Sequence, residues 1–108
     1  MSKMTDALQR WILQFESGKT FFNKINSEVT KRIYLTHLRW YCKAVKKNPD
    51  ELIKLKEEGL KHIGEKIEYQ AENLLENYLA TCEMTMNMKV NTKTAVMSFY
   101  AKNRRRLD

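Results

Sequence analysis

Hydrophobic positions recur with helical spacing along almost the whole chain. In the N-terminal part they lie three and four residues apart, which predicts a helix with one buried face. The residues on that face are Met4, Ala7, Leu8, Trp11, Ile12 and Phe15. Gly18 predicts the end of this helix, and Phe21, Phe22 and Ile25 predict a short apolar connector.

A second helix is predicted over residues 27–46. Ser27 is a favourable N-cap, and Glu28 places an acid at the positive end of the helix dipole. The predicted inward face consists of Val29, Ile33, Tyr34, Leu38, Tyr41 and Val45. The segment Asn48-Pro49-Asp50-Glu51 then supplies a cap, a first-turn proline and two acids, which predicts a short helix ending near Gly59.

Two further helices are predicted in the C-terminal half. A long one runs from Leu60 to about Cys82, burying Ile63, Ile67, Ala71, Leu74, Leu75, Tyr78 and Leu79. Its predicted outer face is acidic, with Glu65, Glu68, Glu72 and Glu76. The last helix spans about residues 87–103, directs Met88, Ala95, Val96 and Phe99 inward, and is expected to fray at Arg104-Arg105-Arg106.

These elements predict an all-α fold, a compact bundle of four main helices joined by short turns and short connecting helices. No strand pattern or repeat occurs, and 108 residues with three Gly and one Pro fit a single domain over 1–108. No apolar run approaches the ~18 residues of a membrane span, and the first residues lack a signal peptide. We therefore expect a soluble, cytoplasmic monomer without a membrane partner.

The chain offers no signature of catalytic or metal chemistry. Cys42 and Cys82 are 40 residues apart without ligand spacing, so two buried thiols are expected, a disulfide being the alternative. His37 and His62 stand apart from each other and from both cysteines. The segment Gly18-Lys19-Thr20 lacks the earlier glycine and the preceding strand of a phosphate-binding loop. We expect no cofactor, no metal and no enzymatic activity.

The charge is segregated along the chain. The total is +7, with +7 in residues 1–48, −5 in residues 49–83 and +5 in residues 84–108. If the two basic ends meet on one face, that face is suited to a polyanion. The alternative is a helical domain whose charges are merely solvated.

The predicted second helix carries a straight stripe opposite its apolar face. Its members are spaced by 4, 3, 4 and 3 residues: Arg32, Thr36, Arg39, Lys43 and Lys46, flanked by Lys31 and Lys47. Like charges at this spacing repel one another, and a phosphate backbone would relieve the repulsion while releasing counterions. The alternative is a basic face with no partner. The last helix has Lys89 and Lys93 one turn apart, beside Asn91 and Thr92, which suits groove entry at a helix start.

Three segments resemble a known family. The run from Phe22 to Ser27 and then from Thr30 to Tyr41 is similar to the first helix of the core-binding domain of tyrosine recombinases, or phage integrases. The places of that pattern are filled by Thr30, Tyr34, Leu38 and Tyr41. Residues 49–53 resemble the connector of archaeal-type members, and residues 94–100 with Asn103 resemble the last helix. The likeness covers roughly residues 20–108, with Met88 where many members have Thr or Ser.

The resemblance implies a SAM-like bundle that clamps one face of duplex DNA, with the helices over about 27–46 and 87–103 approaching the major groove. The DNA-binding residues expected from charge and resemblance together are Thr30, Lys31, Arg32, Thr36, Arg39, Lys43, Lys89, Asn91 and Lys93. Because Met88 cannot replace a hydroxyl group, Thr85, Asn87 or Asn91 would make the DNA contact at the start of the last helix. The catalytic domain that completes such a recombinase would follow Asp108 and is absent from this chain.

Two hypotheses follow. The first is the non-catalytic DNA-binding domain of a site-specific recombinase, whose partners are duplex DNA and a C-terminal catalytic domain. The second is a basic helical protein-interaction module, or a stand-alone DNA-binding regulator. The first requires the two basic helices to present their cations on one surface, with the acidic helix away from it.

Overall fold

Six α-helices follow one another along the chain. The computed structural model describes the backbone of residues 3–107 and the side chains of residues 6–107. The helices are α1 (Lys3–Ile12), α2 (Glu16–Asn23), α3 (Glu28–Val45), α4 (Pro49–Leu60), α5 (Gln70–Thr81) and α6 (Met86–Lys102). No strand occurs in this part of the chain, so the predicted all-α fold is confirmed.

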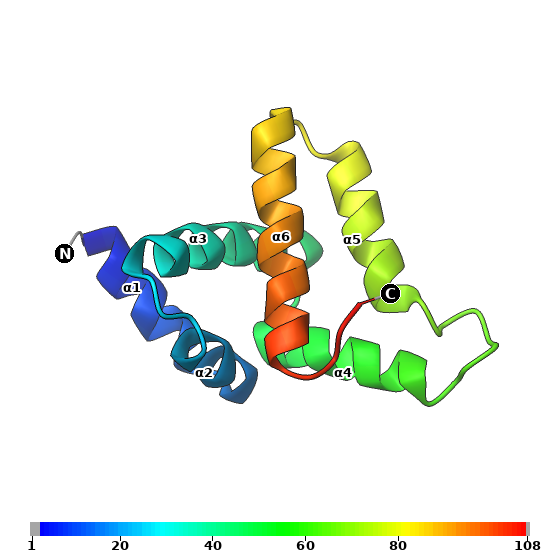
Figure 1. Cartoon of the computed structure of the whole chain (residues 1–108). Helices are drawn as coiled ribbons and strands as arrows, with labels where there is room; N and C mark the ends of the chain where they lie inside the picture. The colour runs from blue at the N-terminus through cyan, green and yellow to red at the C-terminus, as the bar shows by residue number, and fades with distance from the viewer. Residues whose placement is uncertain (1–2, 108) are drawn as a thin grey trace.

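The helices form a bundle around the crossing of α3 and α6, the two longest elements (Figure 1). α1 and α2 lie on one side of this crossing, while α5 forms a hairpin with α6 on the other. α4 runs beneath and packs on both α2 and α5. The radius of gyration, 13.6 Å, is that of a compact domain of this length. In the described part of the chain, no helix has the length and apolarity to cross a bilayer.

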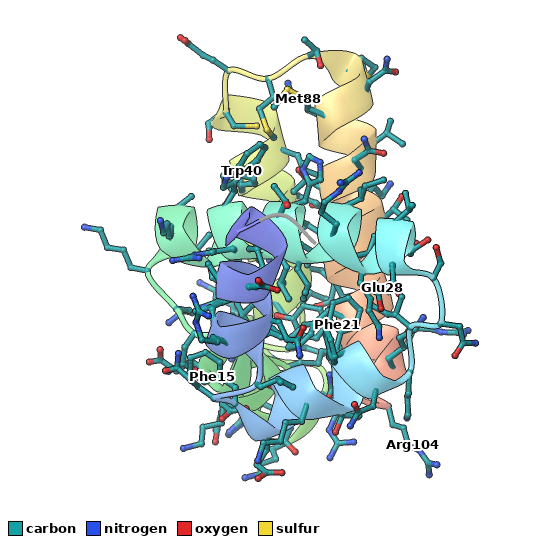
Figure 2. The ribbon with its side chains drawn as sticks, turned by 90° about the vertical axis from the view of Figure 1, so that its left-hand side faces the viewer. Phe15, Phe21, Glu28, Trp40, Met88 and Arg104 are labelled. Atoms are coloured by element: carbon teal, nitrogen blue, oxygen red, sulfur yellow. The ribbon has the colours of Figure 1, made fainter. Side chains whose placement is uncertain are left out.

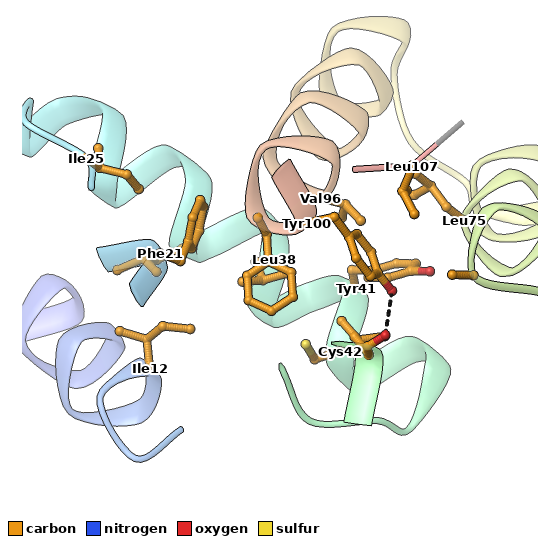
Figure 3. Packing of buried hydrophobic residues seen from close by; sticks show 14 of the residues in the cluster. Ile12, Phe21, Ile25, Leu38, Tyr41, Cys42, Leu75, Val96, Tyr100 and Leu107 are labelled. Atoms are coloured by element: carbon orange, nitrogen blue, oxygen red, sulfur yellow. Dashed lines mark hydrogen bonds between the residues drawn. The ribbon is translucent and has the colours of Figure 1, made fainter. Parts of the chain in front are cut away.

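The core joins all six helices through large side chains. Phe21 of α2 lies edge-on to Phe99 of α6 and stacks on Tyr34 of α3. Tyr100 reaches across the core and donates a hydrogen bond to the backbone carbonyl of Leu52 in α4 at 3.2 Å (Figure 3). A buried ring with its hydroxyl satisfied stabilises the fold through area and through the hydrogen bond together.

The helix starts predicted from capping residues are confirmed. The Ser27 hydroxyl accepts from the backbone N–H of Thr30, and Asn48 forms a complete capping box with Glu51 at the start of α4. α4 ends one residue beyond Gly59, as expected. The two cysteines are free thiols, Cys42 buried and Cys82 only half-buried. Burial raises the pKa of Cys42 to about 12, so this thiol stays protonated and inert.

The predicted N-terminal helix and connector are wrong in detail. The helix stops at Ile12, and residues 16–23, including Gly18 and Phe21, form the separate helix α2. Gly18 is therefore not a stop. A Cβ at this position would lie 2.1 Å from the carbonyl oxygen of Ile12, so glycine is needed for the close approach of α2 to the end of α1. The predicted inward position of Met4 lies outside the described side chains.

The long helix predicted from Leu60 to Cys82 is also wrong. Residues 61–69 form turns around Gly64, whose φ of +87° lies in the left-handed region. Ile63 and Ile67, predicted as core residues, are 75% and 38% exposed. Glu72, predicted on the outer face, is buried and forms an ion pair with Lys56 of α4. A charge in the core is tolerated because it is paired.

The inward face of α3 is rotated from the prediction. Val29 is 58% and Ile33 38% exposed, while Leu35 and Cys42 are buried in their place. Tyr34, like Trp11 of α1, is only partly buried at the edge of the core. The buried positions differ from the prediction because α1 and α6 both pack on α3.

The C-terminal arginines do not fray. After α6, Arg104 takes a left-handed conformation with φ of 60°, and the chain turns back. Arg105 then forms an ion pair with Glu57 of α4 at 2.8 Å, and Leu107 is buried in the core. The three arginines at this end are thus partly engaged in the fold.

Candidate nucleic-acid interface

The stripe predicted on the second helix lies along one side of α3. We call Arg32, Thr36, Arg39, Lys43 and Lys46 the α3 stripe; three of its four cations, Arg32, Lys43 and Lys46, are exposed. The Thr36 hydroxyl donates to the carbonyl of Arg32 at 2.7 Å, so this side chain is held against its own helix. No acid pairs with a stripe cation in the ion pairs of the described residues.

α1 packs beside α3 (Figure 2), and a groove lies along the stripe where these two helices meet. It consists of two adjoining cavities of about 290 and 260 Å³ that share Arg39 and Lys43. We call it the seam groove. Its lining residues are Ala7, Leu8, Trp11, Thr36, Arg39, Trp40, Cys42, Lys43, Lys46, Lys47 and Asn48. It contains four cations and, among these lining residues, no carboxylate.

The turn between α3 and α4 brings the last two lysines into the groove. Lys46 ends α3 in the left-handed conformation, and the N–H groups of Lys46 and Lys47 both reach the carbonyl of Cys42. Asn48 then caps α4. Because the turn is this short, Lys46 and Lys47 remain within the same cavity as Arg39. The negative C-terminal end of the α3 dipole also stabilises cations here, which accounts for part of the clustering of these lysines.

The predicted contacts at the start of α3 are partly committed to the fold. Lys31 lies over the Phe22 ring, with Nζ 4.2 Å from the ring centroid, and pairs with Glu28 at 3.8 Å. Thr30 lines a shallow pocket at the junction of α2, α3 and α6, together with Lys24 and Lys102. The Lys24 ammonium donates to the carbonyl of Lys102 at 2.8 Å there.

The predicted residues of α6 lie in different surroundings. Asn91 is exposed and Lys89 half-buried. Lys93 lines a third groove of about 180 Å³ between α5 and α6, where Glu72 and Glu76 also lie. We call it the hairpin groove. The acidic helix is therefore beside Lys93 rather than away from it, and Lys93 lines neither cavity of the seam groove.

A buried polar contact holds the crossing of α3 and α6. His37 Nδ1 lies 3.0 Å from the Thr92 hydroxyl, and the Trp40 ring meets the imidazole edge-on. Thr92, predicted as a nucleic-acid contact beside Lys93, is instead fully buried. Burial lowers the pKa of His37, so the neutral form is favoured. On a helix, His37 points about 100° away from Thr36, which separates the crossing from the stripe.

Sequence reasoning missed both tryptophans as groove residues. Trp11 was expected in the core, but it lines the seam groove, and the Arg39 guanidinium lies 5.7 Å from its ring centroid. Trp40 is 44% exposed. The sequence signal that was available is the position of Trp40, directly after Arg39 and outside the predicted apolar face.

Comparisons of the chain with protein-family models, with curated proteins and with solved structures find no significant match. The resemblance to recombinase core-binding domains therefore rests on residues 22–27 and 30–41, on residues 49–53, and on residues 94–100 with Asn103.

Proposed function

We propose that this chain is a DNA-binding module that contacts duplex DNA through the α3 stripe. The observation that carries the proposal is the row of exposed cations on α3, in which no described acid forms an ion pair with a stripe cation. Such a row is disfavoured within an isolated helix and is stabilised when it neutralises phosphates.

The resemblance extends the proposal to a biological role. We propose that the module is the non-catalytic clamp of a tyrosine recombinase, with catalysis supplied by a further domain. Two features support this role: the fold is all-helical, and the helices matching the family's DNA-facing pair, α3 and α6, pack directly on each other. The expected single basic surface is met by the α3 stripe and not by Lys93, which lies beside the acidic helix. In this proposal α3 provides most of the phosphate contacts, and α6 a smaller share, because Lys93 lies beside Glu76.

A titration with short duplex DNA at several salt concentrations tests the proposal. If about five phosphates are neutralised, the slope of log K against log salt is expected near −4 to −5. Arg32→Gln should weaken binding and flatten this slope by about one unit. The matched control is Lys54→Gln, an exposed cation on α4, which should leave both quantities unchanged. Equal effects of the two variants, or no duplex binding by the unaltered chain, would contradict the proposal.

A second candidate is favoured by one observation. Val29, Ile33 and Trp40 leave an exposed apolar strip on α3 next to the stripe. An amphipathic acidic partner helix would cover both surfaces. Ile33→Ser distinguishes the two candidates. It should abolish binding of such a partner helix, whereas it should leave the salt slope of duplex binding unchanged.

A further inference from the structure

The seam groove combines positive charge, concavity and an aromatic wall in one place. Arg39 and Lys43 lie in both of its cavities, and Lys46, Lys47 and Trp11 complete the larger one. Along α3, Arg39 to Lys46 spans about 10 Å, at about 1.5 Å per residue. The four cations therefore converge on a short stretch of groove instead of being spread over the surface.

The lining of the seam groove is selective for anions. None of its described lining residues is acidic, whereas the hairpin groove has two carboxylates beside one lysine. The Arg39 guanidinium, placed beside the Trp11 ring, is held toward the groove at little cost in side-chain freedom. A planar guanidinium with neighbouring ammonium groups is the arrangement that binds phosphate oxygens.

We propose that the seam groove is a phosphate-binding site, and that it takes phosphates of the DNA backbone where the strand passes the α1–α3 edge. The inference rests on the proposed function and adds to it the place of tightest contact and a role for α1. It assigns a binding role to Trp11, which neither the charge spacing nor the family resemblance supplied, and it places Lys47, which only flanks the stripe in the sequence, inside the site.

Trp11 provides a direct reporter of this site. The chain has two tryptophans, and Trp40 lines the other cavity of the groove. Trp40→Phe keeps an aromatic ring there and leaves Trp11 as the single tryptophan, so every affinity is compared within this background. In that background, a phosphate drawn to Arg39 changes the charge beside the Trp11 ring and therefore its fluorescence. Two probes distinguish the phosphate sources: a short DNA duplex and inorganic tripolyphosphate.

The test variant is Lys43→Gln/Lys47→Gln in the Trp40→Phe background. The matched control is Lys54→Gln/Lys66→Gln, which removes the same charge from exposed positions outside the groove. We expect the duplex to change the Trp11 fluorescence of the background and the control alike. The groove variant should bind duplex about tenfold or more weakly, with a salt slope flattened by about two units.

The outcomes separate the two proposals. If both double variants lose affinity equally, or Trp11 does not respond, the seam groove is not the site. The proposed function then depends on Arg32→Gln, a stripe position outside the groove, and stands if this variant weakens duplex binding more than Lys54→Gln does. If tripolyphosphate changes Trp11 fluorescence in the control and not in the groove variant, the phosphate site is supported independently of DNA. If that occurs and duplex does not bind, the assignment to the DNA backbone is overturned together with the proposed function.

Discussion

The seam groove and the hairpin groove are both lined by lysines of the predicted basic helices, yet the charges around these lysines differ. In the seam groove, Lys43 lies with three other cations between α1 and α3. In the hairpin groove, Lys93 lies with Glu72 and Glu76 between α5 and α6. The neighbouring helix, and not the helix that carries the lysine, decides whether the cation is available to a polyanion.

Different contacts hold the walls of the two grooves in place. One wall of the hairpin groove is α5, which the buried Lys56–Glu72 ion pair ties to α4. One wall of the seam groove is α1, whose end is held by the close contact of Gly18 with Ile12. The buried His37–Thr92 contact joins α3, which lines the seam groove, to α6, which lines the hairpin groove. Each of these supports can be tested separately.

The largest effect is expected from the ion pair beneath the hairpin groove. Lys56→Met leaves the Glu72 carboxylate buried without its ammonium partner and should lower the free energy of unfolding by about 3–5 kcal/mol. Urea unfolding measures this loss. Lys54→Met, on the exposed side of α4, is the control and should change stability by less than about 0.5 kcal/mol.

A double variant sharpens this prediction. Lys56→Met/Glu72→Leu replaces both charged side chains by apolar ones. It should recover most of the stability, because no charge is then buried without a partner. If Lys56→Met behaved like Lys54→Met, the pair would not be structural, and Glu72 would be available to Lys93.

A smaller effect is expected at the support of the seam groove. Gly18→Ala places a Cβ against the Ile12 carbonyl, so α1 and α2 must move apart, at a cost of about 1–3 kcal/mol. Thermal unfolding followed by circular dichroism measures it. Gly64→Ala is not a suitable control, because its backbone is left-handed; Ala80→Gly, at an exposed position on α5, should cost about 1 kcal/mol from helix propensity alone. A Gly18→Ala variant as stable as the parent would show that α1 is not seated on this contact.

The stability that His37 contributes at the crossing of α3 and α6 should depend on pH. Burial lowers the pKa of His37 in the folded protein, whereas in the unfolded chain this pKa has its usual value of about 6.5. The unfolded chain therefore binds a proton at His37 more readily than the folded protein does. The stability contributed by neutral His37 is present above pH 6.5 and is lost as pH falls below it, by at most about 1.4 kcal/mol per pH unit. Urea unfolding between pH 8 and pH 5 should show a weaker dependence for His37→Gln than for the parent.

The second histidine is the control for this experiment. His62 lies in the turns before α5 beside Glu65 and is not in the core. His62→Gln should therefore retain the His37-dependent loss at acid pH. If stability depended on pH identically in the parent and in His37→Gln, a group other than His37 would cause the pH dependence.

The smallest effect is expected in the hairpin groove itself. Lys93→Gln should weaken duplex binding less than twofold, and Glu76→Gln should strengthen it only slightly by reducing long-range repulsion. Lys43→Gln, measured alongside by anisotropy, should weaken binding several-fold. If Lys93→Gln matched Lys43→Gln, α6 would contribute as much as α3, and the two grooves would be equivalent.

The class of the fold and most of the helix starts could be predicted from local features of the chain. Ser27 and Asn48 cap their helices through contacts within three residues, so the local chain contains all that is needed to predict them. The spacing of the α3 stripe is equally local, since residues three and four apart on any helix share a face. The positions of the basic helices were therefore predictable to within a residue or two.

Which helix faces are covered depends on packing between helices that are far apart in the sequence. The apolar residues of α3 allow more than one inward direction, and packing by α1 and α6 buried Leu35 while leaving Val29 exposed. The acidic helix was predicted too long because its apolar pattern continues through Gly64, where the chain turns. The contrast between Lys43 and Lys93 follows from the same cause. A side chain's electrostatic surroundings depend on residues far away in the sequence, which spacing along one helix cannot specify.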